Sequence, residues 1–287
     1  PDEDEAGGGG EGGDELTGGY HTHRWFSLLY AGGARPVVPG AGTLRAGLRA
    51  VNAALGPRTD LAGRGLDLLL SAGDPARAWA TLRNAWDHQP SRRAEIYGSR
   101  EPTGLLPVSR HFAPLFRDQP PLAAVFAVEQ RFKLADDFLA AEDRMSMAHG
   151  LEVRAPFLDP ALVGWARALP ESRHVALGRG KVAYRAELLR SGLLPGFIAR
   201  RAKWGFSIDP VRQYERTLKP LVESVLTRDA LERIAPVSPD YARQLLALPA
   251  GRTLRWHRFF LWMLAGFVLW HRLFIEGDGE RPGAVTA

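Results

Sequence analysis

Glycines alternate with carboxylates near the amino end of the sequence, in the run Gly9-Gly10-Glu11-Gly12-Gly13-Asp14-Glu15. Glycine carries no Cβ atom, so its backbone N–H groups can approach a phosphate closely. The carboxylates would repel that phosphate unless a cation lay between them. The pattern therefore indicates a loop for a Mg²⁺-bound nucleotide, in which Asp14 ligates the ion and Glu11 faces the reacting group. Taken alone, the same composition favours a flexible acidic linker.

A second group of charged residues lies in the run 142–159, which reads Glu-Asp-Arg-Met-Ser-Met-Ala-His-Gly-Leu-Glu-Val-Arg-Ala-Pro-Phe-Leu-Asp. Asp143 belongs to a helix that leads into a tight turn containing proline, and Arg154 lies within that turn. Unpaired buried charges are very unfavourable, so we expect these charges to be paired among their apolar neighbours. Asp159 precedes Pro160 and is a candidate helix N-cap, which gives it a structural explanation.

Two lysines follow in the second half of the sequence. Lys181 comes directly after Gly178-Arg179-Gly180, and by itself reads as an exposed lysine at the start of a helix. Lys203 could reach a phosphate or a substrate carboxylate, although a solvated lysine explains it equally well. His21 and His23 are two residues apart and do not share a helix face, so we expect a surface position for both.

The elements that position these residues are predicted to be mainly helices. Asp136 is a candidate cap for a helix that ends at Gly150, and the pairs Asp159-Pro160, Asp209-Pro210 and Ser238-Pro239 start further helices. A final helix spans roughly residues 252–275. Its most hydrophobic stretch, Phe259 to Trp270, is only twelve residues long, whereas a membrane span needs about 20 apolar residues. We therefore interpret it as a buried core helix and expect no membrane association.

Composition narrows the functional classes. The 287 residues are 45% hydrophobic, which is enough to bury a core, and they contain no cysteine, which excludes disulfides and thiol nucleophiles from this chain. The net charge of +5 comes from arginines spread over many segments, which favours a general compositional bias over a nucleic-acid surface. The acidic first residues do not resemble a signal peptide, and we expect a cytoplasmic protein.

Three ordered blocks of this sequence resemble the synthetase domain of glutamine-dependent asparagine synthetases. Residues 10–20 resemble the family loop Ser-Gly-Glu-Gly-x-Asp-Glu-Leu-Phe-Gly-Gly-Tyr, and the run 142–159 resembles its central motif. The third block consists of Lys181-Val-Ala-Tyr-Arg185, Leu194-Pro195, Arg201-Ala-Lys203-Trp-Gly205-Phe206 and Pro210. The resemblance covers essentially residues 9–275.

The resemblance implies a mainly α remnant of an α/β adenine-nucleotide-hydrolase-like (HUP-type) domain, in which helices surround a parallel sheet. The family activates the aspartate side chain as an adenylate on Mg-ATP, and ammonia from a glutaminase domain then attacks it. The products are asparagine, AMP and pyrophosphate. The implied partners are therefore aspartate and ammonia, the implied cofactors are ATP and Mg²⁺, and a homodimer is one expectation for the complete protein.

The resemblance also assigns roles to matching positions. Glu11 and Lys181 are the implied catalytic residues, with Lys181 placed to neutralise the departing pyrophosphate. The implied nucleotide-binding residues are Gly9, Gly10, Gly12 and Asp14, and Asp14 is also the implied Mg²⁺ ligand. Supporting roles fall on Asp143, Arg154, Asp159 and Lys203.

The sequence departs from the family pattern at its amino end. The family's pyrophosphate loop, Ser-Gly-Gly-x-Asp-Ser, and the glutaminase half are absent from these residues, while Gly9 replaces the family serine and Thr17 replaces a phenylalanine. We expect an amino-terminally truncated chain that binds ATP poorly and aggregates through exposed apolar faces. We further expect a disordered leader over residues 1–8, one partial synthetase domain over 9–277 and a disordered tail over 278–287.

The sequence leaves two functions other than asparagine synthesis open. A lasso-peptide macrolactam cyclase or a β-lactam synthetase would share the adenylating domain and activate a different carboxylate. An inactive helical interaction module would explain the missing pyrophosphate loop. The acidic loop and the intact central run favour asparagine synthesis, and retention of Glu11, Asp14 and Lys181 argues against an inactive module.

Overall fold

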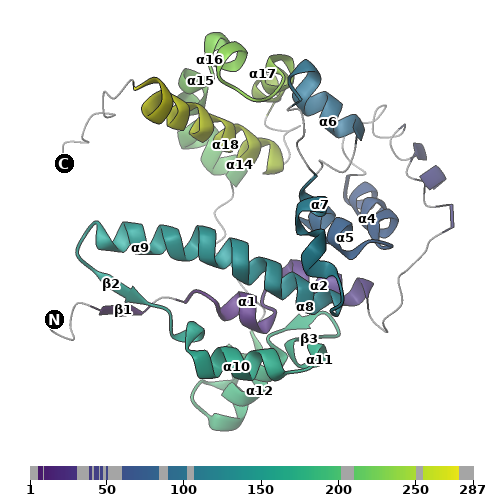
Figure 1. Ribbon diagram of the computed structural model, residues 1–287, viewed down its shortest axis with the longest axis vertical. Coiled ribbons are helices and arrows are strands. Elements are labelled where there is room, and N and C mark those ends of the chain that lie inside the picture. Colours follow the sequence, from purple (N-terminus) through teal and green to yellow (C-terminus); the bar gives the residue numbers. More distant parts are fainter. Residues whose placement is uncertain are drawn as a thin grey trace. The chain divides into compact units, whose positions relative to one another are not determined.

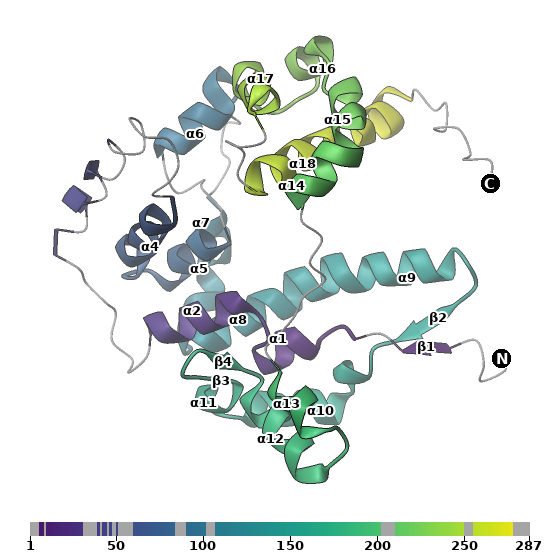
Figure 2. The same ribbon diagram turned by 180° about the vertical axis from the view of Figure 1, so that it is seen from behind.

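The computed structural model describes residues 6–8, 10–30, 39–40, 42–44, 46–47, 50, 60–83, 90–101, 107–201, 210–249 and 255–277. The chain forms two compact units, residues 1–51, 59–85 and 107–203 in the first and residues 52–58, 86–106 and 204–287 in the second. Helices dominate both units, which confirms the mainly α prediction (Figures 1 and 2). The residues expected to form one partial domain, 9–277, are distributed over both units.

The first unit contains the candidate site. Its main helices are α1 (Gly13–Thr17), α2 (His21–Leu29), α4 (Asp60–Ser71), α5 (Pro75–Leu82), α7 (Val108–Phe112), α8 (Pro121–Val128), α9 (Ala140–Met147), α10 (Pro160–Ala168), α11 (Glu171–His174), α12 (Val182–Ser191) and α13 (Gly196–Arg200). The π-helix η6 (Glu129–Leu139) joins α8 to α9, and the 3₁₀ turns η5 (Ala113–Phe116) and η7 (Pro156–Leu158) lie within connections. The strands are β1 (Ala6–Gly8), β2 (Glu152–Arg154), β3 (Val175–Ala176) and β4 (Arg179–Gly180).

The second unit is helical in all its described elements. They are α6 (Pro90–Tyr97), η4 (Gly98–Arg100), α14 (Pro210–Gln213), η8 (Tyr214–Leu218), α15 (Lys219–Val225), α16 (Arg228–Arg233), α17 (Pro239–Ala247), α18 (Arg255–His271) and η10 (Arg272–Glu276). Tyr214, Val222, Leu231 and Leu261 are among the most deeply buried residues of its core. A separate core in the first unit is built around Phe26, Leu122 and Val125, with Trp79 and Phe112 in edge contact.

The glycine-rich leader forms a strand over part of its length, which corrects the expectation of disorder over residues 1–8. Ala6, Gly7 and Gly8 pair in parallel with Glu152, Val153 and Arg154. The backbone of an edge strand offers unpaired N–H and C=O groups, and a glycine segment can satisfy them without side-chain packing. Residues 1–5 and the tail 278–287 lie outside the described residues.

The expected helix cap at Asp136 is wrong. Asp136 lies inside η6, within one helical stretch that begins at Pro121 and continues through α8, η6 and α9 (Figure 1). No proline or glycine interrupts residues 122–147, so nothing in the backbone requires a new start at Asp136. The expected end at Gly150 agrees with its left-handed φ of 71°.

Two other predicted caps are confirmed. The Asp159 carboxylate accepts hydrogen bonds from the backbone N–H groups of Ala161 (2.8 Å) and Leu162 (3.2 Å), and α10 begins at Pro160. Ser238 Oγ accepts from the N–H of Tyr241 at 3.4 Å, and α17 begins at Pro239. In both cases a short polar side chain satisfies N–H groups that have no partner within the helix.

The final helix is only partly buried, which corrects the interpretation of Phe259 to Trp270 as a buried core helix. Its buried apolar side chains include Leu261, Leu264, Ala265 and Val268, and its exposed apolar side chains include Phe259, Trp262, Met263, Phe267, Leu269 and Trp270. The segment His257–Glu276, with 20 residues and a mean hydropathy of 1.4, is long and apolar enough to cross a membrane. A core helix passes the same test, so length and hydropathy alone are weak evidence of a span.

The β3–β4 hairpin carries a strained residue whose replacement should stabilise the chain. Its turn residues, Leu177 and Gly178, have φ values of 48° and 72°, as a type I′ turn requires. A leucine in this conformation costs about 1 kcal/mol, and its side chain is 96% exposed. We expect Leu177→Asn to raise the melting temperature by about 2–4 °C in thermal denaturation. Leu177→Val should lower it, and equal melting temperatures for the two variants would contradict the strain argument.

Candidate functional site

Asp14 and Lys181 meet in the first unit, although 166 positions separate them in the chain. The distance from Lys181 Nζ to Asp14 Oδ1 is 2.7 Å, and the two side chains are 23% and 17% exposed. Asp14 lies in the first turn of α1, whereas Lys181 is the N-cap of α12. The backbone N–H of Lys181 also donates to the carbonyl of Thr17 at 3.0 Å, so the end of α1 holds the start of α12 in place.

Glycines are required where these two segments approach each other. A Cβ atom on Gly180 would collide with the carbonyl oxygen of Gly18, and one on Gly19 would collide with the carboxylate of Asp14. These glycines therefore permit close packing of the loop against Lys181. Gly12 is the N-cap of α1 and packs on Leu158.

Gly9 and Gly10 were also predicted to bind the nucleotide, and the structure describes one of them. Gly10 is exposed, and a Cβ atom on it would meet nothing within 4 Å, so its backbone is accessible. Gly9 lies outside the described residues. The nucleotide-binding role of all these glycines stays a prediction.

Lys181 occupies an unusual environment for a lysine. Its φ of 59° is in the left-handed region, which non-glycine residues rarely adopt and which concentrates at functional sites. Burial lowers the pKa of its ammonium group, and the nearby charge of Arg185 lowers it further. A partly desolvated ammonium interacts more strongly with an anion than a solvated one does.

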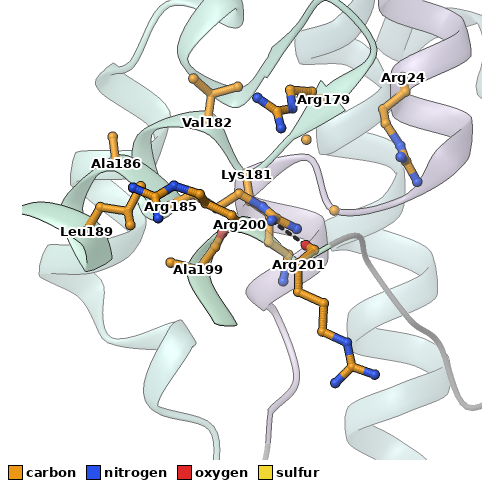
Figure 3. Close-up of a pocket in the computed structure, with 12 residues that line it drawn as sticks. Arg24, Arg179, Lys181, Val182, Arg185, Ala186, Leu189, Ala199, Arg200 and Arg201 are labelled. Carbon is orange, nitrogen blue, oxygen red and sulfur yellow. Dashed lines mark hydrogen bonds between the residues drawn. The ribbon is translucent and has the colours of Figure 1, made fainter. Parts of the chain in front are cut away.

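Lys181 lines a cavity of about 380 Å³ that is rich in cations (Figure 3). The cationic lining residues are Arg24, Arg179, Lys181, Arg185, Arg200 and Arg201, and apolar walls are provided by Val182, Ala186, Leu189 and Ala199. These lining residues belong to α2, to β4, to α12 and its N-cap, to α13 and to the residue that follows α13. This arginine cluster was not predicted from the sequence, although Arg179, Arg185 and Arg201 fall within or beside the third block.

Glu11 contacts a second carboxyl group. Its side chain forms a hydrogen bond with Glu142 of α9, and burial, the charge of Glu11 and this hydrogen bond raise the pKa of Glu142. Glu142 also lines a cavity of about 470 Å³ together with Asp143, Glu152 and Arg154. Two carboxyl groups that share a hydrogen bond retain a proton more readily than an isolated carboxylate. Glu142 is thus a partner of Glu11 that sequence reasoning did not single out.

The predicted supporting residues are mostly exposed. Arg154 pairs with Glu152 at 2.9 Å, but the two side chains are 73% and 62% exposed, so this surface pair contributes little stability. Asp143 is exposed on α9, and Asp159 caps α10. Lys203 lies outside the described residues.

A buried polar contact joins α2 to η6. His23 Nε2 lies 3.0 Å from Glu129 Oε2, and the two side chains are 0% and 1% exposed. The expected surface position of His23 is therefore wrong. It shares one face of α2 with Thr22 and Phe26, and that spacing from Phe26 was the signal in the sequence.

Glu15 of α1 forms further polar contacts with Tyr20 and Lys133. Tyr20 donates a hydrogen bond to the buried Glu15 carboxylate, and burial followed by this bond raises the pKa of the Tyr20 hydroxyl. Lys133 Nζ lies 3.4 Å from Glu15 Oε1 and 3.3 Å from the centre of the Tyr20 ring. Burial lowers the pKa of Lys133. These contacts join α1 and the start of α2 to η6.

Metal binding by protein groups alone finds no support in the described part of the chain. No group of three or more His, Cys, Asp or Glu side chains is placed there to hold an ion. Mg²⁺, however, is commonly bound through one or two carboxylates together with substrate phosphates. Asp14 fits that smaller requirement, because it is a carboxylate beside a cationic cavity.

Comparison with known proteins places the chain in a family. Residues 9–272 match the asparagine synthase family. A proposed glutamine-hydrolysing asparagine synthetase of Mycobacterium bovis is 29% identical over 158 residues, which are 54% of this chain and 23% of the relative. The glutamine-hydrolysing asparagine synthetase 1 of Bacillus subtilis is 28% identical over 145 residues, 49% of this chain and 21% of the relative.

The aligned segments thus span less than a quarter of these relatives. No solved structure matches the chain. The family match covers most of the sequence and includes the loop with Asp14 and the helix start with Lys181. The chain therefore belongs to the asparagine synthase family.

Proposed function

We propose that this chain is the adenylating part of an ATP-dependent amide-forming ligase that converts aspartate to asparagine. The observation that carries the proposal is the 2.7 Å approach of Lys181 to Asp14 at the wall of a cationic cavity. Membership of the asparagine synthase family over residues 9–272 supports the reaction class. Both residues fall on positions where the family loop and lysine are expected.

The first step forms a mixed anhydride. An oxygen of the aspartate side-chain carboxylate attacks the α-phosphorus of ATP, a new P–O bond forms, and the bond to the β-phosphate oxygen breaks to release pyrophosphate. Charge develops on the departing oxygens, and the ammonium of Lys181 is placed to stabilise it. Asp14 would hold the Mg²⁺ of Mg-ATP, which neutralises phosphate charge when bound.

The second step forms the amide. The lone pair of ammonia attacks the activated carbonyl carbon, AMP leaves with the electrons of the broken C–O bond, and nitrogen loses one proton. Glu11 is the candidate acceptor of that proton. Its hydrogen bond to Glu142 links it to a second carboxyl group, whose pKa is raised by burial and by the charge of Glu11. A neighbouring carboxyl group of this kind can share the accepted proton.

The architecture proposed for the complete nucleotide domain is the adenine-nucleotide-hydrolase type. The parallel pairing of β1 with β2 supports it, because that fold is organised around a parallel sheet. The relatives are named as glutamine-hydrolysing, so we propose that ammonia comes from a glutaminase domain outside these residues. We also propose that the complete protein is cytoplasmic and forms a homodimer.

Substrate-dependent adenylation tests this function. The protein expressed from its whole reading frame is incubated with Mg-ATP, ammonium and aspartate, and AMP, pyrophosphate and asparagine are quantified. We expect the three products in equal amounts and only with aspartate. Parallel reactions contain glutamate or a peptide with an internal acidic residue. Product formation with the peptide and none with aspartate would contradict asparagine synthesis and indicate a cyclising relative.

A further inference from the structure

A second cavity of the first unit has a volume of about 240 Å³. Its lining residues belong to α1, α8, η6, α10 and α11 and to the segments beside these elements, which lie near one another in both views (Figures 1 and 2). It shares no lining residue with the cavity at Lys181. A ligand bound here therefore contacts none of the side chains that line the cavity at Lys181.

The buried wall of this second cavity is mostly apolar. Leu16 of α1, Phe126 of α8 and Ala166 of α10 are buried and line it. Ala123 and Ala127 of α8 also line it, and their small side chains leave the space open. Water in an apolar recess has few hydrogen-bond partners, so an apolar group gains free energy by replacing it. At about 30 Å³ per water molecule, the volume fits a ligand of about eight or nine non-hydrogen atoms.

The more accessible part of the lining carries one guanidinium and one carboxylate. Arg167 is exposed, and Glu171 is half-buried. Arg167 Nη2 donates to Gln130 Oε1 at 3.1 Å, and Glu171 Oε1 accepts from the backbone N–H of Ala123 at 3.2 Å. Within the part of the chain that the structure describes, neither charged side chain forms an ion pair, either with the other or with a third group. Two opposite charges therefore line one cavity without neutralising each other.

The third titratable residue of the lining adds no charge at neutral pH. Burial lowers the pKa of the His174 imidazole, which also forms hydrogen bonds with the backbone at Ala166 and Leu169. An imidazole with a pKa below its ordinary value is neutral at pH 7. The lining thus carries one positive and one negative charge, which matches a zwitterion better than a multiply charged anion or a metal cation.

We propose that this second cavity is a binding site for a neutral α-amino acid with a branched aliphatic side chain, of the size of valine or leucine. The α-carboxylate of the ligand pairs with the Arg167 guanidinium, its ammonium group pairs with the Glu171 carboxylate, and its side chain fills the apolar recess. The side-chain charge of aspartate or lysine would be buried in that recess without a partner, so both are excluded.

The amino-acid site contacts the groups that hold α1. Leu16 of α1 lines the cavity, and Gln130, which accepts from Arg167, donates from its Nε2 to the backbone carbonyl of Glu15 at 3.4 Å. Asp14 belongs to the same helix. A bound amino acid adds contacts to both Leu16 and Arg167, so we expect it to hold α1 more firmly and to slow hydrogen exchange of its backbone amides.

The first test is a calorimetric titration of the full chain with L-leucine, without ATP, Mg²⁺ or aspartate. We expect one site. Isocaproate has the carboxylate and the branched chain of leucine but no ammonium group, whereas isoamylamine has the ammonium group and no carboxylate. Each should bind at least about tenfold more weakly than leucine, because each leaves one charge of the lining unpaired. Aspartate should not bind at this site.

Variants assign the binding to this cavity. Arg167→Gln and Glu171→Gln should each weaken leucine binding at least about tenfold, and glutamine at position 171 can still accept from the N–H of Ala123. Ala127→Leu places three more carbon atoms in the recess and should weaken binding as well. Arg173→Gln is the matched control, since Arg173 is exposed on α11 and does not line the cavity, so its affinity should equal that of the unmodified chain.

Several results would overturn the proposal. They are absence of binding by both leucine and valine, equally tight binding of leucine and isocaproate, equal weakening in Arg173→Gln, or leucine-dependent protection from hydrogen exchange in the second unit alone. Circular dichroism checks that the variants are folded. If a variant is unfolded, the comparison of leucine with isocaproate and isoamylamine on the unmodified chain still decides the question.

The amino-acid site goes beyond the proposed function, because binding requires neither a nucleotide nor adenylation. The titrations contain no ATP and no aspartate, so a chain that makes no AMP can still bind leucine. Conversely, a chain that ignores leucine can still make asparagine, and the two failures are therefore distinguishable.

Discussion

Replacing Lys181 by alanine is expected to reduce AMP formation from Mg-ATP and aspartate by about a hundredfold or more. The reason is that the ammonium stabilises charge that develops on phosphoryl oxygens in the transition state, and losing one such preorganised group has effects of this size. The side chain sits 2.7 Å from Asp14 beside the cationic cavity, where burial favours strong electrostatic contacts. Pyrophosphate release in a coupled assay measures the effect.

The control for this prediction is Lys219→Ala. Lys219 lies in the second unit, is 39% exposed and pairs with Glu215 at 3.6 Å, so its removal should leave the rate unchanged. Lys181→Ala should also retain the helical circular dichroism spectrum, because the backbone bond from residue 181 to Thr17 does not involve the side chain. Unchanged adenylation in Lys181→Ala would remove the assigned role.

Replacing Glu129 by alanine is expected to lower the free energy of unfolding by about 3 kcal/mol. His23 and Glu129 are almost fully buried and lie 3.0 Å apart, and removing one partner leaves the other buried without its hydrogen bond. Urea denaturation at pH 7 measures the change. Glu187→Ala is the matched control, because Glu187 is an exposed partner of Arg190 and its loss should change stability little.

The same carboxylate predicts a pH dependence with a definite sign. Burial raises the pKa of Glu129, but the hydrogen bond and charge of His23 outweigh it, and the pKa in the folded state lies below the ordinary value of 4.5. The stability from Glu129 is therefore complete above pH 4.5 and is lost as the pH falls through the lower folded value. Unfolding curves from pH 7 to pH 3 should show a smaller acid-induced loss in Glu129→Gln than in the unmodified chain. Parallel pH profiles would contradict this assignment.

The sequence by itself determined the features that depend on neighbouring residues. Caps at Asp159 and Ser238 were predictable because a polar side chain before proline satisfies N–H groups within the next three residues. The order of three motifs indicated the family, and the family match over residues 9–272 confirms it. That resemblance also assigned both Asp14 and Lys181 to the phosphates of one nucleotide, and the two side chains lie 2.7 Å apart in the structure.

Tertiary structure decided what depends on contacts between distant segments. His23 was expected at the surface because its spacing from His21 was considered alone, whereas it lies on the same helical face as Phe26 and reaches Glu129, 106 residues further on. The strand at Ala6–Gly8 forms because β2 offers it an edge. The arginine cavity gathers residues from several elements, and no local period records that convergence. Periodicity reports which face of an element is apolar, but only the folded chain determines which faces and charges meet.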